Sequence, residues 1–153
     1  MAQRTAQSLL SAQTTGNIGL YYACFRLSRQ GWNVMPTSRN ARGIDILLYS
    51  YDGKRAKTIQ VKSLSKRTAV PLGKTTDHLT ADFVIVCRYV NRDQPECFIL
   101  TPAEVKRLAV RQGRDGKVAY WLSPRHYEAE KYRDKWHRVG IGAPKPAVPT
   151  AKI

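Results

Sequence analysis

Two apolar, strand-like runs joined by an Asp-Gly turn constrain this chain more than any other local feature. The runs span residues 42–49 and 58–63, and Asp52-Gly53 lies in the short polar segment between them. Asp-Gly between two such runs is the strongest short-range hairpin signal, and it favours a two-residue type I′ turn. The sequence therefore predicts an antiparallel hairpin with its tip at these two residues.

The register of this hairpin brings three polar side chains together. With that tip, Tyr51 faces Lys54 and Asp45 faces Gln60. Lys62 lies on the same side of the pleat as Gln60, because side chains alternate with period two. Facing residues have Cβ atoms about 5 Å apart and diagonal ones about 7–8 Å apart, so the three side chains converge on one face. The opposite face is apolar and is expected to join the core: Ile44, Ile46, Leu48, Ile59 and Val61.

A carboxylate, an amide oxygen and an ammonium group placed together suit a hard cation with a phosphate beside it. Asp45 is the first acidic residue of the chain and lies in an apolar run, where a carboxylate is costly to bury without a positive partner. A salt bridge to Lys62 or Arg42 is the alternative for Asp45. For Lys62, the alternative is an edge-strand charge that blocks aggregation.

The charge balance points to an anionic partner. The 153 residues include 26 Lys and Arg against 11 Asp and Glu, which gives a net charge of +15. Charge of this size indicates partners rather than fold, and nucleic acid is the leading candidate. No membrane partner is expected, because no apolar run approaches the roughly 18 residues of a membrane span and no strongly amphipathic basic helix stands out. A basic RNA-associated protein without an active site would share this composition.

The length and the 42% hydrophobic content are typical of one globular domain. Three cysteines, Cys24, Cys87 and Cys97, lie in apolar surroundings without a CxxC spacing. An odd count scattered in this way indicates buried thiols in a reducing compartment. The N-terminus lacks the long apolar region and cleavage site of a secretory signal. These features predict a cytoplasmic protein.

Periodicity and capping signals predict an α/β fold with a mixed central sheet. The nearly continuous apolar run at 81–89 indicates a central strand buried on both faces, and Thr101 to Glu104 forms a capping box that begins a helix. In chain order we expect a helix over 14–30, a strand over 32–35, hairpin strands over 43–50 and 56–63, a loop over 64–80, strands over 81–89 and 96–100, a helix over 101–112 and a strand over 116–122.

The hairpin motif resembles the signature of the PD-(D/E)xK nuclease superfamily, in its variant with glutamine at the second acidic position. The string GID at 43–45, a hairpin, and then QVK at 60–62 carry this resemblance. The superfamily includes type II restriction enzymes and archaeal Holliday-junction resolvases, and the string TGNIG at 15–19 is similar to the first helix of the resolvase-like members. The resemblance covers roughly residues 14–100 and implies a restriction-endonuclease-like αβββαβ core, with a mixed central sheet flanked by helices.

This resemblance implies a metal-dependent DNA endonuclease that hydrolyses phosphodiester bonds with Mg²⁺ or Mn²⁺. Asp45 matches the metal-binding aspartate, and Gln60 matches the second metal-site position. Lys62 matches the lysine that orients or activates the attacking water and stabilises the pentacovalent phosphate. The backbone carbonyl of Val61 is expected as a further metal ligand. A homodimer is expected by analogy with members that cut duplex DNA.

One position departs from the resolvase-like pattern. Leu20 stands where those members often carry a glutamate on the first helix, and residues 1–44 contain no Asp or Glu. Mg²⁺ needs only one or two carboxylates, so weaker metal binding is still expected, and Asp77 or Asp82 are further candidates to complete the site. The alternative function is a catalytically impaired nuclease-fold module that binds nucleic acid. His78 is interpreted as a surface histidine, and a position near the site on its loop is the alternative.

Basic residues around the motif are the candidate DNA contacts. Arg39 and Arg42 closely precede Asp45 and suit a phosphate clamp, because guanidinium pairs with phosphate bidentately. Phosphate contacts position a nucleic-acid backbone without reading its sequence, and a merely solvated face is the alternative. The remaining candidates are Lys54, Arg55, Lys57, Lys66, Arg67 and Lys74.

The chain is divided into three segments on these grounds. Residues 1–13 are expected to form a flexible arm or a short leading helix, and residues 14–139 a single nuclease-like domain. From Gly140 the composition turns to Pro, Ala and Gly, so residues 140–153 are expected to form a flexible tail.

Overall fold

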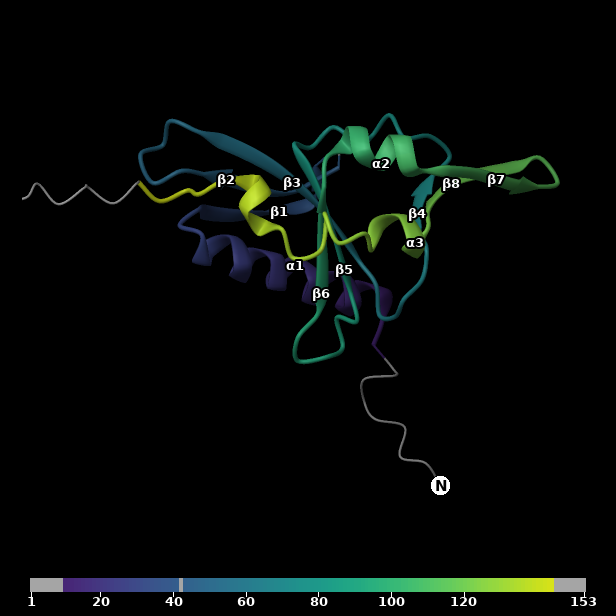
Figure 1. The fold of residues 1–153 in the computed structure, drawn as a ribbon, viewed down its shortest axis with the longest axis horizontal. Coiled ribbons are helices and arrows are strands. Elements are labelled where there is room, and N and C mark those ends of the chain that lie inside the picture. Colours follow the sequence, from purple (N-terminus) through teal and green to yellow (C-terminus); the bar gives the residue numbers. More distant parts are fainter. Residues whose placement is uncertain (1–9, 42, 145–153) are drawn as a thin grey trace, which may run out of the picture.

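Two sheets organise the chain in the computed structural model, which describes residues 10–41 and 43–144 (Figure 1). The larger sheet is mixed, with strand order β1-β2-β3-β5-β6, and the smaller is antiparallel, with order β4-β8-β7. The predicted α/β class with a mixed central sheet is confirmed. The elements are α1 (Ala12–Arg29), β1 (Asn33–Ala41), β2 (Ile44–Tyr49), β3 (Ala56–Ser63), β4 (Val70–Gly73), β5 (Phe83–Arg88), β6 (Glu96–Leu100), α2 (Pro102–Leu108), β7 (Val110–Arg114), β8 (Lys117–Leu122), α3 (Pro124–Tyr127) and the 3₁₀ helix η2 (Trp136–Val139).

Helix α1 covers one face of the central sheet. It begins earlier than predicted, because the Ser11 side chain accepts a hydrogen bond from the Thr14 backbone N–H at 3.1 Å and caps the first turn. It ends as predicted, with Gly31 at a positive φ of 85°. Gly19 faces the sheet, and a Cβ atom there would lie 1.9 Å from Ser63 Oγ. The absence of a side chain at this position lets the helix approach β3 closely.

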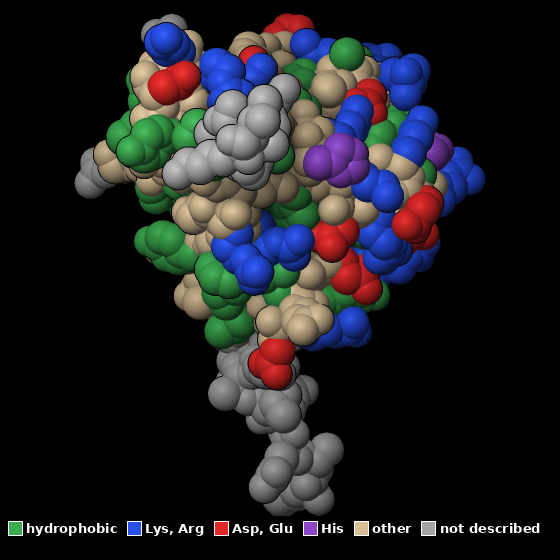
Figure 2. Space-filling model, turned by 60° about the vertical axis from the view of Figure 1, so that its left-hand side comes forward, with side chains coloured by type: hydrophobic (Ala, Val, Ile, Leu, Met, Phe, Trp, Pro, Cys, Tyr) green, Lys and Arg blue, Asp and Glu red, His purple; other side chains and the backbone are tan. Residues whose placement is uncertain are grey.

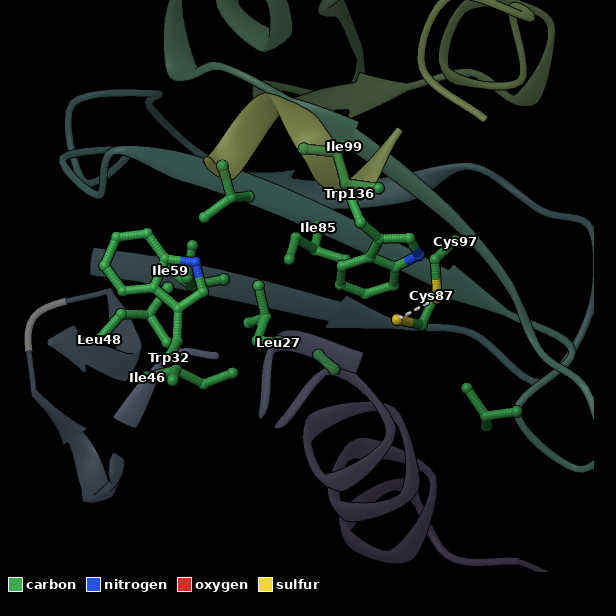
Figure 3. Packing of buried hydrophobic residues seen from close by; sticks show 13 residues of the cluster. Leu27, Trp32, Ile46, Leu48, Ile59, Ile85, Cys87, Cys97, Ile99 and Trp136 are labelled. Carbon is green, nitrogen blue, oxygen red and sulfur yellow. Dashed lines mark hydrogen bonds between the residues drawn. The ribbon is translucent and has the colours of Figure 1, made fainter. Parts of the chain in front are cut away.

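Strand β5 lies at the centre of the fold and is buried on both faces, as its apolar run predicted. Ile85 and Cys87 belong to the hydrophobic cluster under α1, and Val84 and Val86 belong to the cluster under the second sheet. Figure 3 shows the first cluster, in which Cys87 of β5 faces Cys97 of β6 with the sulfur atoms 2.9 Å apart. Both of these thiols are buried and free, as the sequence predicted, whereas Cys24 is free but only partly buried.

The register of the β2–β3 hairpin is the predicted one, but the turn is not. Tyr49 pairs with Ala56, which is the same register as the predicted one with Tyr51 opposite Lys54 and Asp45 opposite Gln60. The predicted type I′ turn needs positive φ at both central residues, and of Asp52 and Gly53 only Gly53 has it. The Asp52 carboxylate instead accepts hydrogen bonds from the Ser50 hydroxyl at 2.6 Å and the Lys54 N–H at 3.1 Å. These bonds hold a wider connection over residues 50–55.

Three other element boundaries differ from prediction. The predicted helix over 101–112 has its capping box but stops at Leu108, and the chain turns into β7. The predicted loop over 64–80 contains β4, which pairs with β8. The first strand continues past Pro36 to Ala41, which is possible because β1 is an edge strand, where a missing N–H is tolerated.

The segment after η2 is hydrogen-bonded to the fold. The Gly142 N–H donates to the Gln30 carbonyl at 3.0 Å, and the Trp32 indole N–H donates to the Gly140 carbonyl at 3.0 Å. Residues 140–142, assigned to the tail from the sequence, are thus in contact with the core, while residues 1–9 and 145–153 of the proposed arm and tail lie outside the described residues. No described helix is both long enough and apolar enough to span a membrane.

Candidate functional site

The candidate site lies where β2 and β3 part. Continued pairing would bring Val61 opposite Ile44. The Ile44 carbonyl instead accepts a hydrogen bond from Thr37 Oγ1 at 2.7 Å, and the Val61 N–H donates to Asp45 Oδ2 at 2.7 Å. The Asp45 carboxylate therefore takes the place of a missing ladder acceptor, and the backbone of β3 holds it in position.

The direction of the β3 backbone places the Val61 carbonyl on the same side. The Leu64 N–H donates to the Cys87 carbonyl on β5, whereas the Val61 N–H points to Asp45 on the β2 side. The N–H and C=O of one strand residue point toward the same neighbour. The carbonyl oxygen of Val61 therefore points toward the gap beside Asp45, as the expected further ligand requires.

The side-chain oxygen of Gln60 is buried without a partner. Gln60 is only 5% exposed, and its Oε1 atom has no hydrogen bond within residues 10–41 and 43–144. Leaving a buried acceptor unsatisfied costs about 1–3 kcal/mol. The amide lies beside Gly43, which has a φ of 81°, and a Cβ there would lie 2.7 Å from the His78 carbonyl oxygen. Gly43 thus allows the chain to pass close to both groups.

Lys62 is half-buried near Asp45 but is not bonded to it. Burial lowers the pKa of the Lys62 ammonium group, and the charge of Asp45 opposes this shift in part. No ion pair joins the two side chains in the part of the chain that the structure describes. The alternative of an Asp45–Lys62 salt bridge is therefore wrong, and Asp45 is bonded to the Val61 N–H instead. Neither side chain forms an ion pair with a described residue, and the alternative of an Asp45–Arg42 salt bridge lies outside the described residues.

Two hollows meet at Asp45, Val61 and Lys62. The larger is a cleft of about 1030 Å³ between the two sheets, and the smaller, of about 270 Å³, lies toward the start of α1. The larger cleft is also lined by Gly43, Gln60, Pro71, Leu72, Gly73, His78 and Thr80. The smaller is also lined by Ala12, Gly16, Asn17, Leu20 and Ser63. The predicted trio of Asp45, Gln60 and Lys62 thus shares one cleft.

Leu20, the first-helix position that departs from the resolvase-like pattern, faces this site with an apolar side chain. Leu20 lines the smaller hollow with Asp45 and Lys62. Asp82 does not complete the site, because its carboxylate accepts hydrogen bonds from the Thr58 N–H at 2.8 Å and hydroxyl at 3.1 Å. Asp77 does not line either hollow. Among the described residues, no cluster of three or more His, Cys, Asp or Glu side chains could hold a metal ion.

One lining feature could not be expected from the sequence. His78 is exposed, as predicted, and it also lines the larger cleft, which was the alternative for this residue. The wall opposite Asp45 comes from Pro71, Leu72 and Gly73 of β4, which lay in a predicted loop. No spacing in the sequence links these residues to the motif, because their position depends on the pairing of β4 with β8.

The candidate DNA-contacting residues are spread over the molecule. Lys54 and Arg55 lie at the β2–β3 connection, at the opposite end of these strands from Asp45, and Arg55 donates to the Ile141 carbonyl at 2.9 Å. Arg67 forms a bidentate ion pair with Glu128.

The other basic candidates are also separated from one another. Lys57 pairs with Leu48 on β2, and Lys66 and Lys74 are exposed. Arg42 and the side chain of Arg39 lie outside the described residues. The face in Figure 2 carries Lys and Arg in several groups with Asp and Glu between them. The assignment of these residues to DNA contacts stays a prediction.

Comparison with known proteins identifies similar structures rather than similar sequences. No family model and no curated protein matches this sequence. The fold is similar to that of the bacterial homing endonuclease I-Ssp6803I, with a TM-score of 0.57 and 17% identity over 84% of this chain and 91% of that chain. Hjc, a Holliday junction resolvase from the archaeal hyperthermophile Archaeoglobus fulgidus, aligns with a TM-score of 0.48 and 13% identity over 71% of this chain and 90% of that chain. The first likeness shows a shared fold.

Proposed function

We propose that this protein is a divalent-metal-dependent DNA endonuclease of the PD-(D/E)xK type, with its site at Asp45, Gln60 and Lys62. The observation that carries the proposal is the buried, unpaired Gln60 Oε1 atom in the same cleft as Asp45 and Lys62. A bound cation would supply the partner that this oxygen lacks. The fold shared with I-Ssp6803I, which is described as a homing endonuclease, supports the same assignment.

The oxygen atoms in the site suit Mg²⁺ or Mn²⁺. Asp45 offers a carboxylate, Gln60 an amide oxygen and Val61 a backbone carbonyl. Mg²⁺ commonly binds through one or two carboxylates and keeps several waters, so these donors fit it even with Leu20 on the first helix. When bound, the metal would polarise the phosphate as a Lewis acid and lower the pKa of its water.

The side chains themselves have separate tasks. The Val61 N–H orients the Asp45 carboxylate and so holds it in place before a metal binds. Lys62 supplies positive charge where negative charge develops on the phosphate, and its partial burial makes this charge more effective than one in water. Lys62 lies in the same cleft as Asp45 and Gln60, where its ammonium group could also orient the attacking water.

The partner proposed for this site is DNA, in duplex or branched form. The net charge of +15 supports a polyanionic substrate. A homodimer and a cytoplasmic location remain predictions from the sequence. Sedimentation equilibrium at micromolar protein, with and without DNA, measures the oligomeric state. Fractionation of cells that express the chain measures the location.

A cleavage assay tests the proposed function. Plasmid, linear duplex, single-stranded and four-way-junction DNA are incubated with wild type, Asp45→Ala and Lys62→Ala in Mg²⁺, in Mn²⁺ or in chelator. Asp93→Ala and Lys131→Ala remove the same charges at exposed positions outside both hollows. We expect metal-dependent cleavage that is lost in the two site variants and kept in the two control variants. Cleavage that survives Asp45→Ala would overturn the proposal.

The alternative function is a nuclease-fold module that binds nucleic acid without cutting it. Leu20 favours this alternative, because an apolar side chain occupies the helix position that faces Asp45 and Lys62. It predicts tight, salt-sensitive DNA binding that survives both site substitutions, with no cleavage and no heat of Mg²⁺ binding in calorimetry.

A further inference from the structure

The β7–β8 hairpin leaves the body of the molecule as a two-stranded ribbon (Figure 1). Strand β4 pairs only with Tyr120, Trp121 and Leu122 of β8. From residue 119 to the tip, β8 therefore pairs only with β7. Residues 111–117 are exposed without interruption. The ribbon is built from backbone pairing rather than from packing on the core.

The tip of this ribbon is a tight turn. Arg114 pairs with Lys117, and the two residues between them, Asp115 and Gly116, have φ values of 55° and 75°. Positive φ at both central residues is the requirement of a type I′ turn, whose twist matches that of the flanking strands. The ribbon can therefore hold its twisted shape although its end is exposed.

The ribbon carries unpaired positive charge. Arg111, Arg114 and Lys117 form no ion pair with any residue that the structure describes, and Asp115 is the one acidic residue of the hairpin. Because Gln112 pairs with Ala119 and Arg114 with Lys117, alternation places Gln112, Arg114 and Lys117 on one face. Arg111 lies on the other face.

We propose that the β7–β8 ribbon enters the major groove of duplex DNA and presents Gln112, Arg114 and Lys117 to the base edges. The major groove, about 12 Å wide, admits a two-stranded ribbon, and Arg, Lys and Gln are side chains that pair there with guanine and adenine. The positive charge complements the phosphates on both sides of the groove. This inference rests on the proposed function, because it takes the substrate to be DNA.

The ribbon and the candidate site belong to one connected surface. Gly73 of β4 lines the cleft with Asp45 and pairs with Tyr120 of β8. From Tyr120 to Lys117 the ribbon extends about 10 Å further, at about 3.3 Å per residue. A duplex in the cleft can therefore also reach the ribbon, which would give the site the base recognition that phosphate contacts lack.

DNA binding in chelator tests the proposal without requiring cleavage. Fluorescence anisotropy with a 30-base-pair duplex is measured over a salt series for wild type and for the triple variant Arg111→Ala/Arg114→Ala/Lys117→Ala. A matched triple variant, Arg29→Ala/Arg92→Ala/Lys131→Ala, removes three exposed cations on α1, the β5–β6 turn and the segment after α3. Thermal melting of all three proteins checks that the substitutions leave the fold intact.

We expect the ribbon variant to lose about tenfold or more in affinity, because it loses both cations presented to the bases. Its salt slope should be lower by about 1, because it also loses Arg111, the ribbon cation left to contact a phosphate, and each neutralised phosphate contributes about 0.9 to the slope. The matched variant should stay close to wild type. Equal losses in the two variants would overturn the proposal, because the ribbon would then be no more than part of a diffuse positive surface.

Modified duplexes test the groove. Methylation of guanine N7 blocks an acceptor in the major groove, where Arg and Lys pair with guanine, so it should weaken binding by wild type but not by Arg114→Ala/Lys117→Ala. Duplex RNA has a deep, narrow major groove and should bind more weakly than DNA. Equal affinity for both duplexes, or methylation that has no effect on wild type, would contradict major-groove entry.

The two proposals fail in different ways. If the ribbon variant cleaves DNA and binds it as tightly as wild type does, the ribbon proposal is overturned and the nuclease proposal stands. Ribbon-dependent DNA binding without cleavage under any metal would overturn the nuclease and leave the ribbon as a DNA-binding element.

Discussion

The molecule contains two hairpins that share the Asp-Gly dipeptide and differ in almost everything else. The β2–β3 hairpin is joined by a wide connection over residues 50–55, and the Tyr51 N–H at that connection donates to the Gly142 carbonyl. The β7–β8 hairpin has the tight turn at Asp115 and Gly116 and projects from the body of the molecule (Figure 1). The first hairpin carries the candidate site, and the second carries the proposed DNA-reading ribbon.

This difference shows how far a local turn signal can be trusted. Asp115 and Gly116 are exposed, and both have the positive φ of the turn that the backbone preferences of this dipeptide favour. At Asp52-Gly53 the Asp52 carboxylate bonds to Ser50 and Lys54, and a wider turn results. The register of β2 and β3 nevertheless stays as predicted, because the apolar face must point to the core and a one-residue slip would turn it outward.

The largest expected contrast between the hairpins is in catalysis. Lys62→Ala should lower the single-turnover cleavage rate by about 10²–10³-fold, the usual effect of losing one preorganised charge stabiliser. Lys117→Ala on the ribbon should leave that rate unchanged at saturating protein and raise only the Kd. Quenched-flow measurements at several protein concentrations separate the two effects. If Lys117→Ala also lowers the cleavage rate at saturating protein, the division between a catalytic hairpin and a binding hairpin is wrong.

The hairpins should also respond differently to an apolar substitution. Gln60→Met removes a buried oxygen that has no partner among the described residues, so the metal-free protein should gain about 1–2 kcal/mol in unfolding free energy while cleavage is lost. Gln112→Met at an exposed ribbon position should change stability by less than about 0.5 kcal/mol. Urea denaturation in chelator measures both, and a destabilised Gln60→Met would mean that the amide has a structural partner.

Glycine substitutions compare the two turns directly. Gly53 and Gly116 both have positive φ, at 70° and 75°, and a Cβ atom added at either would meet open space. Alanine at either position is strained by about 1 kcal/mol. Gly53→Ala should lower global stability by about that amount, because its turn joins two strands of the core. Gly116→Ala should instead increase amide hydrogen exchange within residues 110–119, because the ribbon can open locally. If Gly116→Ala lowers global stability as much as Gly53→Ala does, the ribbon unfolds together with the core.

Acid should weaken the bridge by which Glu128 links the segment before β4, in the sheet that carries the ribbon, to β5 of the larger sheet. Hydrogen bonds from Arg67, before β4, and Arg88, in β5, lower the pKa of Glu128 to about 2. Because this pKa is below that of an unfolded glutamate, near 4.3, the stabilisation is complete above about pH 4.3 and is lost as the pH falls toward 2. Thermal melts between pH 2.5 and 6 should therefore show less acid sensitivity in Glu128→Gln. An unchanged pH profile would contradict this role for Glu128.

The core of the fold was predictable because its signals are local and strong. The apolar run at 81–89 predicted a buried central strand, and Gly31 marked the end of α1. The predictions that failed involve weak local preferences. Residues 109–112 continue an acceptable helix pattern, but the Asp115-Gly116 turn and the pairing with β8 draw them into β7. That dipeptide was the sequence signal that could have identified the ribbon.

The sequence by itself determined the register of the site hairpin, and therefore that Asp45, Gln60 and Lys62 share a face. This follows from period-two alternation and a core-facing apolar stripe, which depend on neighbouring residues alone. Only the tertiary structure decided that the Val61 N–H holds Asp45, that Gln60 Oε1 is left unpaired among the described residues, and that Leu20 and β4 enclose the site. These features depend on where β2 leaves β3 and on contacts between residues far apart in the chain, which no local pattern encodes.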